Sequence, residues 1–199
     1  MPRPRMRIVP YEECAEELLE LRRLALVAAQ QVTPGTPASA MYDPRDSEAL
    51  IAIAELDGQL VGSLRIVPPL DDDVLFHPDN RVLGTLVGLP PKSDYAEASK
   101  ACVHPEYQGQ GVFWHIAAHM ILAGRQLGKT HLVGGTNPRV WKFWQRCGYR
   151  LTENRYVGPN RPEIKYSVMV LDIDAVLGGR VEIAPQLVDA LEFAQRPMG

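Results

Sequence analysis

A strand that runs into a glycine-containing loop and then into a helix, over residues 97–128, most constrains the fold of this chain. Residues 97–103 suit a buried strand, Pro105 ends it, and Gly109 and Gly111 precede the helix. A helix that starts after such a loop presents free backbone N–H groups at the positive end of its dipole. Phosphate is a natural ligand for such groups. The loop by itself is equally compatible with a tight turn that binds nothing.

The elements after this helix extend the pattern. The apolar pattern of residues 131–136 predicts a short strand. The pattern of residues 137–149 predicts a short helix that follows an Asn. This order resembles the GNAT superfamily of N-acyltransferases over about residues 50–173. The loop of that superfamily reads [Q/R]-x-x-G-x-[G/A]. Gln108 and Gly111 match it, and Phe113 stands where Gly or Ala is usual.

The resemblance implies a coenzyme A donor, which is acetyl-CoA or another acyl-CoA, and no metal. In the superfamily the loop amides hold the pyrophosphate of the coenzyme, and its pantetheine arm pairs with the preceding strand. The cofactor-binding residues implied here are Cys102, Val103, Gln108, Gly109, Gln110, Gly111, Val112, Phe113 and Asn137.

The segment that follows Asn137 carries a second motif. It resembles N-x-x-A-x-x-x-Y-x-x-x-G-[F/Y], which Asn137, Gly148 and Tyr149 match. Val140 takes the Ala position, and Trp144 stands where Tyr is usual. Since an indole N–H is no useful acid, we expect Trp144 to be part of a wall, either as a core aromatic or as one that lines the substrate groove.

Acyl transfer to an amine requires a base, because the amine must be neutral to attack. Glu97, on the strand that leads to the loop, is the best-placed base, although an exposed strand carboxylate is the alternative. Backbone N–H groups near Cys102 and Val103 would polarise the thioester carbonyl. The leaving thiolate departs without strict protonation, or a tyrosine donates the proton. Tyr149 is the predicted catalytic tyrosine, and Tyr156 and Tyr166 remain open.

A narrower resemblance links the chain to acyl-homoserine-lactone synthases and long-chain N-acyl amino acid synthases. These enzymes carry D-x-x-D, V-G-x-x-R and E-x-S-R-F-x-V segments and take fatty acyl groups from an acyl carrier protein. The resemblance implies that Asp43, Asp46 and Arg65 shape the acceptor pocket and that Glu97 is the base or a clamp. Lys100 replaces the usual Arg, which is not a neutral change.

Three functions therefore stand open. The favoured one is transfer of an acyl group, acetyl in the first instance, from coenzyme A to an amine or amino acid by direct attack. The first alternative is an acyl-homoserine-lactone or N-acyl amino acid synthase that uses an acyl carrier protein or long-chain acyl-CoA. The second is an acyl-CoA-binding module without turnover. The resemblance leaves the acceptor, the acyl chain length and a homodimer undecided.

The expected fold class is α/β, a GNAT fold with a mixed, mostly antiparallel sheet, splayed at 97–103, and helices on both faces. We expect an acyltransferase domain over residues 1–175 and a helical appendage over 176–199. The expected strands are 7–11, 51–56, 59–67, 95–103, 131–136, 150–157 and 163–173, and the expected further helices are 12–30 and 181–196. Asp57-Gly58 predicts a type I′ turn. Residues 71–93 are expected to be irregular with a short helix, and residues 31–40 to be a loop, either over the acceptor site or a passive connector.

Composition narrows the partners and the location. The 199 residues carry a net charge of −3, so no basic field indicates a nucleic acid partner. No apolar run approaches the roughly 20 residues that span a bilayer, and no signal peptide is evident. Three scattered cysteines form no disulfide framework, so we expect a cytoplasmic protein. His115 and His119 lack a third metal ligand, and 71–73 lack the spacing of a calcium loop.

Overall fold

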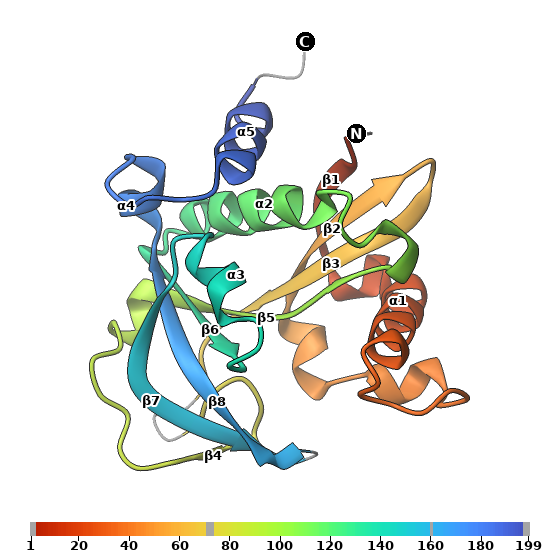
Figure 1. Cartoon of the computed structure of the whole chain (residues 1–199), viewed down its shortest axis with the longest axis horizontal. Coiled ribbons are helices and arrows are strands. Elements are labelled where there is room, and N and C mark those ends of the chain that lie inside the picture. Colours follow the sequence, from red (N-terminus) through yellow and green to blue (C-terminus); the bar gives the residue numbers. More distant parts are fainter. Residues whose placement is uncertain (1–2, 71–73, 160, 197–199) are drawn as a thin grey trace. The chain divides into compact units, whose positions relative to one another are not determined.

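The computed structural model describes residues 3–70, 74–159 and 161–196, which form two compact units. Unit 1 comprises Met1–Val67, Lys100–Met120 and Gln186–Gly199. Unit 2 comprises Pro68–Ser99 and Ile121–Pro185. The acidic run 71–73 lies outside the described residues. Strand β5 (Tyr95–Val103) and helix α2 (Val112–Gln126), both labelled in Figure 1, each contribute residues to both units.

The strands of unit 1 are neighbours in the order β1, β2, β3 and β5. They are β1 (Arg5–Pro10), β2 (Leu50–Leu56), β3 (Gln59–Val67) and the end of β5. The antiparallel β2–β3 hairpin turns at Asp57 and Gly58, whose φ angles are 51° and 81°. Two positive φ values are the mark of a type I′ turn, which confirms the turn predicted from sequence.

Helices and short 3-10 turns complete unit 1. They are η1 (Tyr11–Glu13), α1 (Ala15–Ala28), η2 (Ala38–Met41), η3 (Pro44–Glu48), η5 (Pro105–Tyr107), the start of α2, and α5 (Pro185–Ala194). The core of this unit includes Leu18 of α1 and Ile51 and Ile53 of β2. On β3, a Cβ added at Gly62 would fall 2.5 Å from Cδ1 of Ile116 and 3.1 Å from Cγ1 of Val112. The glycine therefore lets the first turns of α2 pack directly on β3.

The strands of unit 2 are neighbours in the order β5, β6, β8, β7 and β4. They are the start of β5, β6 (His131–Thr136), β8 (Arg161–Asp172), β7 (Arg150–Gly158) and β4 (Arg81–Val82). β5 pairs with β6 in parallel, and the pairs β6–β8, β8–β7 and β7–β4 are antiparallel. The parallel register ends at Ala98↔Gly134, although β5 continues to Val103. The sheet is therefore mixed and interrupted on β5, as predicted.

Unit 2 also contains η4 (Lys92–Asp94), α3 (Trp141–Gln145) and α4 (Ile173–Leu177). Its core combines apolar and aromatic residues from β5, β6, β7 and β8 with two residues from the segment before β4. They are Leu75, Phe76, Tyr95, Val133, Tyr156, Val168 and Val170.

The structure corrects three predicted elements. The helix predicted at 12–30 begins at Ala15, because a 3-10 turn precedes it. The single tail helix predicted at 181–196 is α5, which begins at Pro185, a residue that suits a first helical turn. A separate α4 precedes it and ends at Gly178 and Gly179. The region 71–93 contains the short strand β4, whose pairing with β7 joins residues far apart in the chain.

Candidate functional site

The loop between η5 and α2 offers free backbone amides in unit 1. Gly109 and Gly111 have φ angles of 76° and 86°, which residues with a Cβ rarely adopt. Within the described part of the chain, the amides of Gly109, Gly111 and Val112 have no hydrogen-bond partner. Since Val112 begins a helix of 15 residues, these donors lie at the positive end of its dipole. The arrangement suits an anion with several oxygens.

Other groups of the loop are engaged within the protein. The amides of Gln108 and Gln110 donate long hydrogen bonds, of 3.4 and 3.3 Å, to carbonyls of η5. The Gln108 side chain donates to the Val103 carbonyl at 3.2 Å, and the Gln110 side chain to the Glu106 carbonyl at 2.7 Å. The two glutamines therefore brace the loop, and the glycines and Val112 leave donors open.

On β5, Cys102 is half-buried beside Ser63. Its Sγ lies 3.2 Å from the Ser63 Oγ. Burial raises the pKa of the Cys102 thiol, against the hydrogen bond from Ser63. A thiol with a raised pKa is a weak nucleophile, so Cys102 is a poor candidate for a covalent intermediate.

The predicted acceptor residues are joined in one ion network in unit 1. Arg65 Nη1 lies 3.1 Å from both Asp43 Oδ2 and Asp46 Oδ1. Lys100 Nζ lies 3.0 Å from Asp43 Oδ2. Arg22, which sequence reasoning did not select, binds Asp46 with two hydrogen bonds of 2.6 and 3.0 Å. Arg22 lies on α1, and no local motif connects it with Asp46.

Local structure orients the two carboxylates of the network. Asp43 is the N-cap of η3 and accepts a hydrogen bond from the amide of Arg45, while Asp46 accepts one from the amide of Asp43. This reciprocal pattern is a capping box. Asp43, Asp46 and Arg65 are 2% exposed or less, whereas the side chain of Lys100 is 33% exposed. Lys100 is therefore the member that solvent reaches.

Charge compensation sets the protonation of this network. Burial alone would raise the pKa of Asp43, but Lys100 and Arg65 outweigh it and lower that pKa to about 2. Burial would also raise the pKa of Asp46, but the hydrogen bond and the charge of Arg22 outweigh burial and lower that pKa. Burial lowers the pKa of Lys100, and Asp43 opposes that change. The carboxylates thus stay ionised at neutral pH.

The predicted base, Glu97, lies in unit 2 and is fully buried. Its Oε1 accepts a hydrogen bond of 3.4 Å from the amide of Phe76. Phe76 holds this position with a φ of 64°, an uncommon conformation for a bulky residue. The Phe76 ring packs against Tyr156 at 5.2 Å between centroids, and Tyr156 stacks on Tyr166 at 5.2 Å. Sequence reasoning did not single out Phe76 as part of this site.

Three further predicted residues also lie in unit 2. Tyr149 is 3% exposed, and burial raises the pKa of its hydroxyl. Trp144 meets Tyr149 edge to face at 5.6 Å. The Asn137 side chain accepts a hydrogen bond of 2.9 Å from the amide of Arg139, so it forms the turn that precedes α3. The predicted site residues therefore form two groups, one in each unit.

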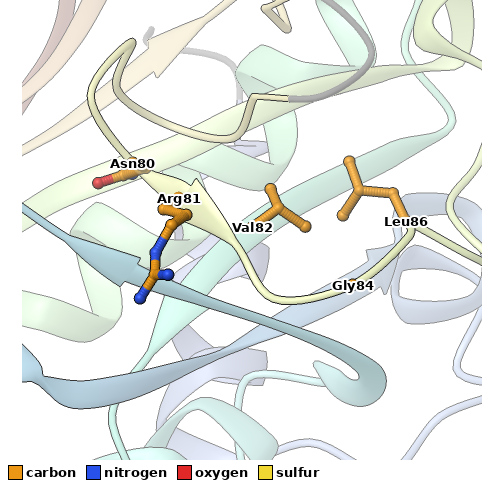
Figure 2. A pocket seen from close by; sticks show the side chains of 5 residues that line it. All are labelled: Asn80, Arg81, Val82, Gly84 and Leu86. Atoms are coloured by element: carbon orange, nitrogen blue, oxygen red, sulfur yellow. The ribbon is translucent and has the colours of Figure 1, made fainter.

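Two surface cavities lie in unit 2. One of about 360 Å³ is lined by residues on and after β4: Asn80, Arg81, Val82, Gly84 and Leu86 (Figure 2). The other, of about 550 Å³, lies between the end of α3 and residues 181–185, and Tyr149 is in its wall. No other predicted site residue lines either cavity.

Within residues 3–70, 74–159 and 161–196, no group of three His, Cys, Asp or Glu side chains could hold a metal. No helix in the same residues is long and apolar enough to cross a membrane. His115 and His119 are adjacent on α2, where His119 Nδ1 lies 3.0 Å from the His115 carbonyl oxygen.

Sequence comparisons identify related proteins. The family model described as "Acetyltransferase (GNAT) family" matches residues 15–149. The tRNA(Met) cytidine acetyltransferase TmcA of Salmonella typhimurium is 31% identical over 75 residues, which are 38% of this chain and 10% of TmcA. The match thus spans only a small part of that relative's length.

Solved structures show the same fold. The CoA-dependent acyl-homoserine lactone synthase BjaI, solved with SAM and isopentyl-CoA, superposes with a TM-score of 0.70 at 15% identity, over 98% of this chain and 90% of BjaI. An acyl-CoA N-acyltransferase from Pseudomonas aeruginosa gives a TM-score of 0.61 at 15% identity, over 84% of this chain and 99% of its own. These likenesses confirm the fold class predicted from sequence.

Proposed function

Because the chain belongs to the Acetyltransferase (GNAT) family, we propose that it transfers an acyl group from acyl-CoA to a small-molecule amine by direct attack. The observation that supports this most is the set of open amides at Gly109, Gly111 and Val112. Three donors at the start of a long helix match the oxygens of a diphosphate. Acetyl-CoA is the first donor to consider.

The remaining roles follow from the chemistry of aminolysis. An amine near neutral pH is mostly protonated and must lose its proton before it attacks the thioester. Glu97 is the proposed base, because it is a buried carboxylate on the strand that leads to the loop. The backbone of Cys102 and Val103 is proposed to align the pantetheine arm. No covalent enzyme intermediate is involved, which agrees with the raised pKa of the Cys102 thiol.

Thermal unfolding with acetyl-, octanoyl- and palmitoyl-CoA tests the donor. A ligand that binds the folded state raises the melting temperature by mass action, so the largest shift identifies the preferred chain length. Thiol release from that donor is then measured with L-glutamate, spermidine, kanamycin and a peptide with a free N-terminus. Free CoA that shifts the melting temperature as much as the donors would show that the acyl group is not recognised. The absence of any shift would refute the proposal.

The ion network favours a second candidate, a synthase that acylates an amino acid derivative. Asp43, Asp46, Arg65 and Lys100 carry the narrower resemblance to acyl-homoserine-lactone synthases, and they form one connected network. BjaI is named as CoA-dependent, and its structure holds SAM and isopentyl-CoA. Thiol release from isopentyl-CoA with S-adenosylmethionine, and from an octanoyl carrier protein with the same acceptor, tests this candidate. Turnover with S-adenosylmethionine that exceeds turnover with every simple amine would favour it.

A further inference from the structure

The cavity of about 550 Å³ between the end of α3 and residues 181–185, called the α3 cavity below, has no role in the proposed function. All of the residues that line it belong to unit 2. Neither Glu97 nor the open amides of the loop before α2 are among them. The volume of the cavity is within the roughly 300–1,000 Å³ that is common for small-molecule sites. The α3 cavity is therefore a candidate for a second ligand.

Backbone packing holds together the two segments that form the α3 cavity. Gly148 has a φ of 96°, and a Cβ added there would fall 3.2 Å from Cγ2 of Ile183. The glycine thus lets residues 181–185 pack closely on the turn between α3 and β7. The amide of Ala184 donates a hydrogen bond of 2.8 Å to the carbonyl of Arg146. This bond ties the segment to the end of α3, so the cavity lies between two connected segments.

Part of the lining of the α3 cavity is apolar. Tyr149 and Ala184 are buried, and Val181 and Ile183 are half-buried. The half-buried aliphatic side chains retain apolar surface that water contacts. A ligand that covers this surface gains free energy from the hydrophobic effect. The apolar part of the lining therefore suits an aliphatic or aromatic group.

The polar part of the lining contains one uncommitted side chain of each charge. Arg150 and Glu182 both line the cavity and are exposed. Neither side chain makes a hydrogen bond or an ion pair with a described residue, so the two do not pair with each other. A guanidinium presents a planar fork of donors that matches a carboxylate. A carboxylate accepts strong hydrogen bonds from an ammonium group.

We propose that the α3 cavity binds a free α-amino acid with an apolar side chain. Arg150 binds its carboxylate, Glu182 binds its ammonium group, and the aliphatic lining covers its side chain. A ligand with only a negative charge would meet Glu182 as a like charge, and one with only a positive charge would meet Arg150 in the same way. An uncharged apolar ligand would desolvate both charged groups without a partner for either. A zwitterion satisfies all three parts of the lining.

Binding of amino acids to the full chain, without acyl-CoA, tests the ligand class. Ligand-detected NMR with L-leucine, L-methionine and L-phenylalanine, each up to about 10 mM, is expected to show saturable binding of at least one. The amide of that amino acid lacks the carboxylate, and the matching carboxylic acid lacks the amine. Each analogue is expected to bind about tenfold more weakly, because it leaves one charged group of the cavity unmatched. The absence of saturable binding, or equal binding of either analogue, overturns the proposal.

Charge-removing variants test whether the amino acid binds in the α3 cavity. Arg150→Gln and Glu182→Gln are compared with the matched controls Arg125→Gln and Glu153→Gln. All four side chains are exposed in unit 2, and each change removes one charge, so the fold is expected to persist. The Kd is expected to rise about tenfold in the first two variants and to stay within about twofold of wild type in the controls.

The analogues give each variant its own signature. Arg150→Gln is expected to remove the preference for the amino acid over its amide, and Glu182→Gln the preference over the amine-free acid. An unchanged Kd in both variants would place the amino acid elsewhere on the protein, the proposed acceptor site included, and would overturn the assignment. The inference does not rest on acyl transfer, because a chain that acylates no amine of the panel can still bind an amino acid in this cavity.

Discussion

The ammonium of Lys100 lies 3.0 Å from the buried carboxylate of Asp43, while the backbone of Lys100 has a φ of 51°. A lysine in the left-handed region within a strand carries a conformational cost of roughly 1–2 kcal/mol. The ion pair offsets this cost and ties β5 to the cap of η3. Lys100 follows the last residue of β5 that pairs with β6 by two positions. Asp43 therefore stabilises the irregular part of β5 through the Lys100 side chain.

Substitutions at Lys100 distinguish the energetic cost of its positive φ angle from the stabilisation by its ion pair. Lys100→Gly and Lys100→Ala both remove the ammonium, but only glycine adopts a positive φ freely. We expect both variants to be less stable than wild type, and the glycine variant to be more stable than the alanine variant by about 1 kcal/mol in urea unfolding. Glycine normally destabilises relative to alanine, so this reversed order is diagnostic. An alanine variant that is the more stable one would contradict the strained conformation.

The lowered pKa of Asp43 predicts a dependence of stability on pH. Its pKa falls from about 3.8 in the unfolded chain to about 2 in the folded protein. The contribution of Asp43 to the free energy of unfolding is complete above pH 4. It is lost as the pH falls toward 2, because the unfolded chain then binds more protons than the folded protein. The shift corresponds to about 2 kcal/mol. Asp43→Asn, which retains a cap acceptor, is expected to be less stable by at least that amount at pH 7.

Urea unfolding of wild type and Asp43→Asn at several pH values from 7 to 2.5 measures this contribution. The difference between the two proteins should shrink below pH 4. Asp189→Asn, an exposed change on α5, serves as the control and should stay within about 0.5 kcal/mol of wild type. A difference between wild type and Asp43→Asn that is constant over the whole range would exclude titration of Asp43.

Gly111 allows a charge test of the proposed diphosphate site. Asp and Asn have the same shape and tolerate a positive φ similarly, so Gly111→Asp and Gly111→Asn impose the same backbone strain. We expect the aspartate variant to lose the melting shift caused by acetyl-CoA and the asparagine variant to retain most of it. For wild type at 100 times the Kd, that shift corresponds to about 2.7 kcal/mol. Equal responses of the two variants would exclude an anion at this loop.

The lowered pKa values of His115 and His119 predict a second dependence of folding stability on pH, nearer to neutral pH. Burial lowers the pKa of both rings, and the charge of Arg3 adds to the effect at His115. A lowered folded-state pKa means that stability is complete above pH 6.5 and falls as the pH drops below that value. The ring of Phe193 on α5 packs edge to face against His115 at 6.1 Å. We therefore expect α5 to lose contact energy in mild acid.

Melting temperatures between pH 7.5 and 5 test this expectation. The curve of the double variant His115→Gln/His119→Gln should be flatter than that of wild type. The protection factors of the α5 amides in hydrogen exchange, which correct for the pH dependence of intrinsic exchange, should be smaller in wild type at pH 5.5 than at pH 7.5. Parallel melting curves for the two proteins would assign the acid sensitivity to other groups.

Local sequence signals predicted the parts of the fold that local interactions determine. Asp57-Gly58 indicated the turn of the hairpin, and the glycines at 109 and 111 indicated the bend before α2, because each depends on its own backbone. The strands followed from hydrophobic patterns, and the mixed sheet followed from the resemblance to the GNAT superfamily. The D-x-x-D resemblance selected Asp43 and Asp46, which the structure joins to Arg65.

Features that depend on long-range packing were missed. Arg22 was not among the predicted site residues, and its ion pair with Asp46 forms only when α1 packs beside η3. Phe76 lies in a stretch without periodicity, and its positive φ is stabilised by contacts with Glu97 and Tyr156. The strand β4 has two residues, too few for a detectable alternation, and pairs with β7 about 75 positions away. The sequence contains no local signal for such pairings.

Gly62 is expected to make the proposed donor site sensitive to a residue that need not touch the donor. Its missing side chain lets the side chains of Val112 and Ile116 approach β3 in the first turns of the helix whose start carries the open amides. A methyl group at position 62 would press on Ile116 and Val112 and is expected to displace the first turn of α2 together with its free amides. Screens for altered donor preference are therefore expected to find position 62 intolerant of change, and variation in chain length selectivity to arise elsewhere.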